Sequence, residues 1–490
     1  MPGTITRAEV LAAQKAWADG LLKISADFQS GGYSKAKATA TEVILREYDY
    51  QYGPVAFKPT LTVAPQVFRP TFDGALSYFV GGNPQFPADT GFALSQYTSY
   101  KYENNVIQLY GDSAISMGNV YLYDPKGVPT IVDKTFGFNK SPDGSININL
   151  HHSSLPHPRG GPVQVRPGAE DLRQSSNISS YKTSLSDVLS AQNAWGEALL
   201  KISADYKSGG ISKARTTAEG VIDGAYNYQH GPVAFKPTLT EVPETFRPTF
   251  DGALSYFVGG NDPEYANDKG FALQSGALEQ WTSFKFENKV IQLDGDSAIS
   301  MGNVYVTDQK GNVTVVDKTF GWNKSSDGTM RINLHHSSLQ EPSSNSSTSP
   351  TGAPVYRLLS SSGDHFFTNN AKEVDSVTGT GHIYEGIGFS TPNNGTQGLY
   401  RFYNASRRAH FYTASEVEKN ALVAPSSGYA FEGNMGNVYS PGSAVPFSTP
   451  VYRLFNAGSG MHHFTIDQRE RDSLLSPSSG WASEGIGFNV

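Results

Sequence analysis

The sequence predicts an α+β protein: two tandem cone-shaped domains, each with helices packed on a curved antiparallel sheet, followed by an all-β domain of pseudo-threefold, β-trefoil-like architecture. Two internal duplications carry this prediction, one filling most of the chain and a shorter one confined to its C-terminal part. The third observation is that the hydrophobic period of each long copy changes from helical spacing to strict alternation.

Composition narrows the function classes. The chain has 490 residues, a formal net charge of −7 and 12% aromatic residues, so we expect packed domains and neither nucleic-acid nor membrane-surface binding. It has no cysteine, which excludes disulfides, thiolate metal sites and cysteine nucleophiles. The N-terminus does not look like a signal peptide, and no apolar run approaches the roughly 20 residues of a membrane span. A cytoplasmic location is therefore the default expectation.

The long duplication is almost literal in places. FRPTFDGALSYFVGGN occurs at Phe68–Asn83 and again at Phe246–Asn261. GDSAISMGNVY occurs at Gly111–Tyr121 and at Gly295–Tyr305. Two copies of one domain are the simplest explanation. The predicted bounds are 5–156 for the first domain, 157–183 for a linker and 184–340 for the second domain.

Each copy opens with a helical pattern. Thr6 and Glu9 have the spacing of a capping box, and Ser184 and Asp187 repeat it in the second copy. Alanine, leucine and tryptophan then recur at helical spacing until the glycine pair at 31–32, after which a second helical stretch follows. We expect a helix, a break and another helix.

The pattern then becomes that of strands. Gly53–Thr62 is expected to form a strand, and the segment after Pro70 a third helix that ends at glycines 81–82. Alternation with period two follows, which predicts an antiparallel meander after the helices and hence an α+β domain. A bent sheet wrapped over a helix would leave a conical pocket. Hairpin turns are predicted at 104–105, 125–127 and 142–144.

The C-terminal part carries a different repeat, of about 45 residues per unit. The units begin with VYRLLSSSGDHFFT at Val355, LYRFYNASRRAHFYT at Leu399 and VYRLFNAGSGMHHFT at Val451. Their strand-rich and turn-rich composition predicts a pseudo-threefold all-β domain, with a β-trefoil as first choice. The domain is expected over 354–490, after a Ser/Pro linker at 341–353.

Each of these units repeats the same side chains: an aromatic residue followed by arginine, then a histidine, then a glutamate before glycine. Arginine and glutamate could pair to close the domain. Alternatively, aromatic side chains beside polar groups suit a carbohydrate-binding module, with a glycan as partner. The units resemble tail repeats of bacterial and fungal extracellular proteins. The residues are Tyr356-Arg357, His365 and Glu385; Tyr400-Arg401, His410 and Glu432; and Tyr452-Arg453, His463 and Glu484.

Histidine pairs at 151–152 and 335–336 end the last strand of each long copy. Neighbours on a strand point to opposite faces, so one histidine of each pair faces the pocket at most. A three-histidine zinc site needs two further ligands, but His157 and His230 each occur in one copy alone. We therefore expect no metal, with zinc or manganese held by one histidine and carboxylates such as Asp73 as the alternative.

Six hydroxyl side chains lie in segments that are duplicated without change. Singly, each is most simply a packed core or strand residue. Together they are candidates for catalysis, since hydroxyl groups both donate and accept hydrogen bonds and can orient water. They are Thr60, Tyr78 and Ser153 in the first copy and Thr238, Tyr256 and Ser337 in the second.

The strings KPT, FRPTFDGALSYFVGG, GDSAISMGNV, DKTFGFNK and INLHHSSLP together resemble the iota-class carbonic anhydrase family over nearly all of each copy. The resemblance implies a cone fold of the ketosteroid-isomerase and calmodulin-dependent kinase II association-domain superfamily. It also implies a lyase that reversibly hydrates CO₂ to bicarbonate, in this branch without metal. In such enzymes a Thr, a Tyr and a Ser hold bicarbonate, which implies catalytic roles for Thr60, Tyr78 and Ser153 and for Thr238, Tyr256 and Ser337.

The proton acceptor is left open by the sequence. A tyrosine can serve only if its pKa lies well below the usual value of about 10. His151 or His335 could instead relay protons to solvent, since histidine titrates near neutral pH.

Two alternative functions remain at this point. One is a non-catalytic association module of the same fold with a lectin-like tail. The other is isomerase or hydrolase chemistry, for which Asp73 and Asp251 are the available bases. In either case we expect the two copies to pair as an intramolecular pseudo-dimer, or two chains to form a homodimer.

Overall fold

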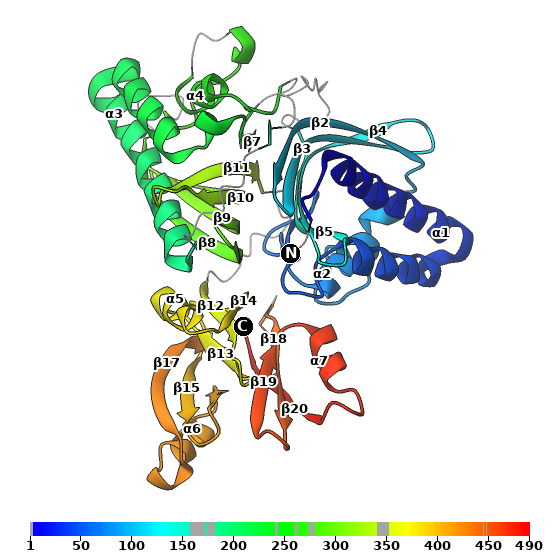
Figure 1. Ribbon diagram of the computed structural model, residues 1–490, viewed down its shortest axis with the longest axis vertical. Helices are drawn as coiled ribbons and strands as arrows, with labels where there is room; N and C mark the ends of the chain where they lie inside the picture. Colours follow the sequence, from blue (N-terminus) through cyan, green and yellow to red (C-terminus); the bar gives the residue numbers. More distant parts are fainter. Residues whose placement is uncertain are drawn as a thin grey trace. The chain divides into compact units, whose positions relative to one another are not determined.

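The computed structural model describes residues 3–156, 172–173, 182–240, 244–259, 263–273, 280–340, 352–443, 445–446 and 448–490. The predicted linkers at 157–183 and 341–353 lie mostly outside these residues. The chain divides into two compact units (Figure 1). The first comprises Met1–Val63, Val67–Pro70 and Gly74–Ser343, and the second comprises Ala64–Gln66, Thr71–Asp73 and Ser344–Val490.

The first copy begins with the long helix α1 (Arg7–Glu47), and the predicted capping box is present. The Thr6 side chain accepts from the backbone N–H of Glu9, while the Thr6 N–H donates to the Glu9 carboxylate over 2.8 Å. Gly32 has a φ of +70°, which breaks α1 into two helices at the predicted place. Ser184 and Asp187 form the same capping box at the start of α3 (Leu185–Ala225).

Four long antiparallel strands of the first copy form the predicted meander, and the short β1 joins it in parallel to β5. The sheet order is β1-β5-β4-β3-β2-β6. The helix α2 stands between β1 and β2 in the chain. The strands are β1 (Ala56–Lys58), β2 (Ser99–Tyr110), β3 (Ser113–Tyr123), β4 (Pro129–Lys140), β5 (Ile146–Ser154) and β6 (Leu172–Arg173); the short helices are α2 (Phe72–Val80) and η1 (Phe92–Leu94).

One predicted turn is wrong. Asn104 and Asn105 lie inside β2, where the pairing with β3 shifts register between Asn104 and Val106. This is a β-bulge, which places an extra residue in one strand and bends it. Gly118 lies opposite the bulge, and a Cβ there would approach the Glu103 carbonyl oxygen to 2.1 Å. The turns predicted at 125–127 and 142–144 do connect strands.

The second copy repeats this architecture, with the sheet order β7-β11-β10-β9-β8. Its short β7 again pairs in parallel with the last strand of the meander. The α+β prediction is confirmed for both copies. The remaining elements are η2 (Tyr228–His230), β7 (Ala234–Lys236), α4 (Phe250–Val258), η3 (Pro263–Tyr265), β8 (Trp281–Asp294), β9 (Ser297–Asp308), β10 (Val313–Lys324) and β11 (Met330–Leu339).

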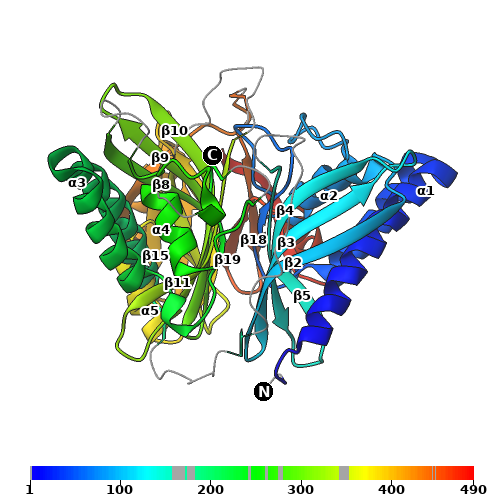
Figure 2. The ribbon, with the colours of Figure 1, turned by 90° about the horizontal axis from the view of Figure 1, so that it is seen from above.

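The two copies contact each other through their sheets, and α1 and α3 lie on the outer sides (Figure 2). The imidazole rings of His152 and His336 stack at the centre of this interface, with centroids 3.7 Å apart. Their neighbours are reciprocal, since each histidine Nδ1 lies 2.8 Å from a threonine hydroxyl of the other copy. Two ion pairs, both buried, flank the stack at 3.5 Å: Lys58 with Asp317, and Lys236 with Asp133.

The second unit contains three successive repeats, each with one three-stranded sheet and one helix. The predicted threefold repeat is thus present. The all-β expectation is wrong, because each repeat places a helix of seven to nine residues between its second and third strands. The β-trefoil is not confirmed. The elements are β12 (Gly352–Leu359), β13 (His365–Thr368), α5 (Ala371–Gly379), β14 (Ile383–Pro392), β15 (Gln397–Asn404), β16 (Ala409–Thr413), α6 (Glu416–Leu422), η4 (Pro425–Ser427), β17 (Ala430–Val438), β18 (Pro450–Asn456), β19 (Met461–Thr465), α7 (Gln468–Leu474) and β20 (Trp481–Asn489).

The predicted arginines link these repeats into a ring, which we call the arginine ring. Each arginine binds the glutamate before glycine in its own repeat and a helix glutamate of another repeat. Arg401, for example, lies 2.9 Å from both Glu432 and Glu373. The other members are Arg357 with Glu385 and Glu470, and Arg453 with Glu484 and Glu418.

The third repeat corrects one predicted residue. His462, not His463, occupies the position of His365 and His410, because it pairs with the equivalent residue of the first strand. His462 also contacts Glu484 over 3.4 Å, as His365 contacts Glu385 over 3.3 Å. The preceding histidine of the HH pair is therefore the repeated one.

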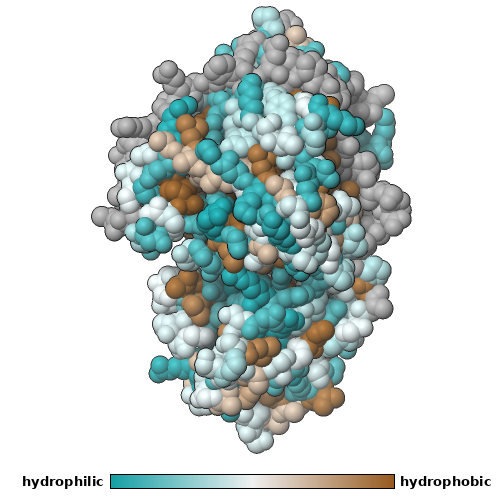
Figure 3. All heavy atoms as spheres, turned by 90° about the vertical axis from the view of Figure 1, so that its right-hand side faces the viewer, coloured by the Kyte–Doolittle hydropathy of each residue, from teal (hydrophilic) through white to brown (hydrophobic). Residues whose placement is uncertain are grey.

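On the face drawn in Figure 3, hydrophobic side chains form small separate groups among polar ones. Within the described residues, no helix is both long enough and apolar enough to cross a membrane.

Candidate active site

The three candidate hydroxyl groups of the first copy come from three different elements and meet in its interior. Ser153 lies on β5, Tyr78 on α2, and Thr60 just beyond β1. The parallel pairing of β1 with β5, in which Lys58 lies opposite His152, brings Thr60 level with the end of β5. The Thr60 and Ser153 hydroxyls are hydrogen-bonded, and Thr60 is also a partner of the Tyr78 phenol. All three side chains are buried.

The second copy repeats the arrangement. The Thr238 and Ser337 hydroxyls lie 2.5 Å apart, and Thr238 is a partner of the Tyr256 phenol. All three side chains are again buried. The sequence-predicted residues are thus brought together in both copies, which the linear spacing alone did not require.

Aromatic rings fix the tyrosines. The Tyr78 ring stacks on Phe92 at 5.2 Å and meets the edge of Phe57 at 5.5 Å. Tyr256 has the same two contacts, with Phe271 at 5.4 Å and Phe235 at 5.5 Å. These rings give the site an apolar wall, as a small apolar substrate requires.

The environment of these tyrosines bears on their protonation. Burial raises the pKa of Tyr78 well above its usual value, and it raises the pKa of Tyr256 in the same direction. Desolvation disfavours the phenolate. Burial thus works against the phenolate that a proton-accepting tyrosine needs, and a neutral phenol both donates and accepts hydrogen bonds.

The first histidine of each pair faces the same interior. His151 stacks on Phe57 with centroids 4.4 Å apart. Its Nδ1 lies 2.7 Å from the Tyr48 hydroxyl, and its Nε2 lies 2.9 Å from the Nζ of Lys134. Burial, with the neighbouring Lys134, lowers the pKa of His151 well below its usual range. A relay that depends on ordinary histidine titration is therefore disfavoured, and the role of His151 and His335 stays a prediction.

The second histidine of each pair points the other way, into the interface between the copies. Of the carboxylates that the sequence offered, neither Asp73 nor Asp251 hydrogen-bonds to a hydroxyl set within the described residues. The same residues contain no group of three or more His, Asp and Glu side chains that could hold a metal ion. His157, the third histidine of the first copy, lies outside the residues that the structure describes.

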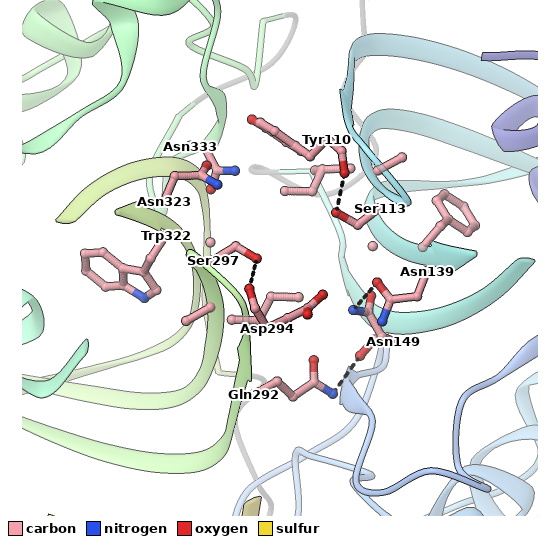
Figure 4. Close-up of a pocket in the computed structure, with 17 residues that line it drawn as sticks. Tyr110, Ser113, Asn139, Asn149, Gln292, Asp294, Ser297, Trp322, Asn323 and Asn333 are labelled. Carbon is pink, nitrogen blue, oxygen red and sulfur yellow. Dashed lines mark hydrogen bonds between the residues drawn. The ribbon is translucent and has the colours of Figure 1, made fainter. Parts of the chain in front are cut away.

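A cavity of about 50 Å³ also lies between the two copies (Figure 4). Equivalent asparagines of both copies line it, but it includes none of the candidate hydroxyl groups. Its lining includes Tyr110, Ser113, Asn139, Asn149, Gln292, Asp294, Ser297, Trp322, Asn323 and Asn333. We therefore distinguish it from the candidate site.

Comparison with known proteins decides the family. The family described as metal-independent carbonic anhydrase matches residues 8–155 and 186–339. The chain belongs to the metal-independent carbonic anhydrase family. Residues 346–490 match a domain of unknown function, DUF5648. The family resemblance found in the sequence and the expected independence of metal are confirmed.

Parts of this chain are similar to individual proteins. A metal-independent carbonic anhydrase from Nostoc sp. (strain PCC 7120) is 50% identical over 153 residues, which are 31% of this chain and 75% of the relative. The crystal structure of a cyanobacterial iota-carbonic anhydrase complexed with bicarbonate is 48% identical, covering 32% of this chain and 97% of that one, with a TM-score of 0.32. A structure described as a calcium/calmodulin dependent protein kinase II association domain from Xanthomonas campestris is 20% identical over 34% of this chain and 98% of its own, with a TM-score of 0.21.

Sequence reasoning missed several residues of the site. Tyr48 and Lys134 contact His151, and their counterparts Tyr226 and Lys318 contact His335. Lys134 lies in the duplicated string DKTF, which was available as a signal. The sequence alone does not show that this lysine is buried, with only 4% of its surface exposed.

Proposed function

We propose that both N-terminal copies are independent active sites that interconvert CO₂ and bicarbonate without a metal ion. The observation that carries the proposal is the buried set of three hydroxyls, which is complete in each copy of a chain of this family. The proposed residues are Thr60, Tyr78 and Ser153 in the first copy and Thr238, Tyr256 and Ser337 in the second.

The chemistry follows from the surroundings of these hydroxyls. CO₂ is small and apolar, and the rings around Tyr78 offer it an apolar wall. As water attacks the carbon, negative charge develops on the CO₂ oxygens. Preorganised hydroxyl donors in a buried site stabilise that charge without reorganising. The neutral Tyr78 phenol suits this donor role.

Stopped-flow CO₂ hydration tests the proposal. We expect protein that has been treated with EDTA, and shown to be metal-free by elemental analysis, to keep its full rate. A rate that vanishes with the chelator and returns with Zn²⁺ or Mn²⁺ would contradict metal independence, and an inactive untreated protein would contradict the activity itself.

We also propose domain bounds of 5–156, 184–340 and 354–490, and a pairing of the first two domains within one chain. The reciprocal ion pairs and the stacked histidines across the two sheets support this pairing. Because the sheet of each copy already contacts the sheet of the other copy, these two sheet faces are not available to a second chain. Sedimentation equilibrium should therefore give the mass of a monomer, 52.9 kDa, and a stable dimer would argue against internal pairing.

For the C-terminal repeats we infer that the arginine ring has a structural role, since its arginines and glutamates bind one another. Glycan binding would then depend on exposed aromatic side chains. Phe431 is the best candidate, because 47% of its surface is exposed and its ring lies beside Phe402. A glycan array with the full chain and with Phe431→Ser tests this; glycan binding that Phe431→Ser weakens would support it, whereas no binding, or equal binding by both, would refute it.

A further inference from the structure

Each N-terminal copy buries one lysine in its interior without any carboxylate partner among the described residues. In the first copy the Nζ of Lys134 lies 2.9 Å from the His151 Nε2 and 4.0 Å from the centre of the Trp17 ring. In the second copy Lys318 lies 3.0 Å from His335 and 4.0 Å from Trp195. A buried lysine is costly unless it is paired or uncharged. Burial lowers the pKa of both lysines well below the usual value.

The hydrogen bonds around His151 indicate where the protons lie. The Trp17 indole N–H donates to the Tyr48 oxygen over 2.8 Å. Tyr48 is then free to donate its own hydrogen to the His151 Nδ1, 2.7 Å away. The remaining proton of a neutral imidazole is on Nε2, which points at Lys134. In this arrangement the lysine accepts the hydrogen bond as a neutral amine, in keeping with its burial and its lack of a carboxylate partner among the described residues.

This amine and the hydroxyl set lie on the same face of the sheet. Lys134 and Ser153 are directly opposite each other on β4 and β5. Opposed residues of an antiparallel pair share a face and have Cβ atoms about 4.5–5.5 Å apart. His151, two residues before Ser153 on β5, shares the face as well. A water bound at Ser153 would therefore lie on the same face of the sheet as the amine of Lys134.

We propose that the Lys134–His151 pair, and the Lys318–His335 pair in the second copy, accept the proton that CO₂ hydration releases. The inference rests on the proposed hydroxyl site. In the step, the oxygen of water forms a bond to the CO₂ carbon, and one C=O electron pair moves onto oxygen. An O–H bond of the water breaks, and its proton goes to the amine of the pair. When bicarbonate leaves, the ammonium returns the proton to solvent.

Charge balance makes the pair suitable for this task. Before the reaction the site holds no net charge, and afterwards the ammonium faces the bicarbonate anion. The face of the Trp17 ring also stabilises a cation at this distance. The other titratable groups near His151 are Tyr48 and His152, and burial disfavours the charged form of both; Lys58, whose Nζ donates to the Ser153 carbonyl oxygen, is paired with Asp317. Lys134 is thus the group that takes up the charge.

A double variant, Lys134→Met with Lys318→Met, tests the proposal. Methionine fills a similar volume and removes the amine. We expect kcat for CO₂ hydration to fall on the order of 10²-fold, the usual lower bound for acid–base catalysis. We also expect the wild-type inflection in the pH–rate profile to disappear. The matched control is Lys140→Met with Lys324→Met, equivalent lysines that pair with Glu9 and Asp187, which should keep the wild-type rate and profile.

The possible failures are distinguishable. An inactive wild type refutes the hydroxyl site, whereas an active wild type and a folded double variant with equal rate and equal pH profile refute the lysine pair alone. If the double variant does not fold, the titration of the lysines in the wild-type protein tests the proposal instead. With lysine labelled at ¹³Cε, burial should lower the pKa of Lys58 and Lys236 as well as that of Lys134 and Lys318, but only two resonances should both titrate well below the usual value of about 10.4 and move upward with saturating bicarbonate. Ordinary titration of all lysines, unaffected by bicarbonate, would refute the proposal.

Discussion

Replacing the two site tyrosines by phenylalanine should separate the contributions of the two copies. Tyr78→Phe removes one hydroxyl and leaves the ring between Phe57 and Phe92 unchanged. The Tyr78 hydroxyl has its partner, Thr60, in its own copy, and the same is true of Tyr256. Since neither hydroxyl set contains a residue of the other copy, their rates should add. The single variant should therefore keep about half of the wild-type rate.

The magnitude for the double variant follows from the role of the phenol. Loss of one preorganised donor to a developing oxyanion costs about 10²–10³-fold in kcat, or about 2.7–4 kcal/mol. Tyr78→Phe with Tyr256→Phe should therefore leave about 1% of the rate or less. The loss of one neutral hydrogen bond in each copy costs only about 1 kcal/mol of stability, so both copies should stay folded.

Stopped-flow hydration with a pH indicator is the assay, and circular dichroism melting is the control for folding. Thr41→Val is a matched surface change, because the Thr41 hydroxyl bonds only to its own helix, and it should leave the rate unchanged. A folded double variant at the wild-type rate would refute the donor role of tyrosine. A single variant that loses nearly all activity would refute the independence of the two copies.

Three further predictions concern stability. Lys58→Met leaves Asp317 buried without its cation, so it should cost about 3–5 kcal/mol in urea unfolding, and adding Asp317→Leu should recover most of it; a small single effect would contradict the ion pair. Burial lowers the pKa of His152 and His336 in the folded protein. Protonation below about pH 6.5, the pKa of histidine in the unfolded chain, therefore favours unfolding, so the free energy of unfolding should fall as the pH falls below this value. Replacing both histidines by glutamine should flatten this pH dependence in thermal melts. Arg401→Met leaves two ring glutamates without their arginine and should lower the Tm of the C-terminal repeats, whereas an unchanged Tm would deny the ring a structural role.

Much of the fold could be predicted because the governing signals are local. The capping boxes, the helix break at Gly32 and the alternating strands each depend on residues close in sequence. The bulge at Asn104 could not be told from a turn, since Asn-Asn favours turns and the decisive fact is the close approach of Gly118 from the next strand. The helices of the C-terminal units were missed because each spans only seven to nine residues.

The candidate site was predictable only in part. Duplication and family resemblance led to the three hydroxyl groups, but not to their mutual hydrogen bonds, which depend on the parallel pairing of β1 with β5. The second histidine of HHSS is at the interface because neighbours on a strand face opposite ways, and its partner is a residue of the other copy. The burial of Lys134 depends on packing against Trp17, more than a hundred residues earlier.

A crystal structure of metal-free protein soaked in bicarbonate tests the central claim most directly. We predict one bicarbonate in each N-terminal copy, with its oxygens within hydrogen-bond distance, about 2.5–3.0 Å, of the Thr60, Tyr78 and Ser153 hydroxyls and of their second-copy equivalents. We also predict no anomalous metal signal at either site. Bicarbonate bound elsewhere, or bound through a metal ion, would contradict two metal-independent hydroxyl sites.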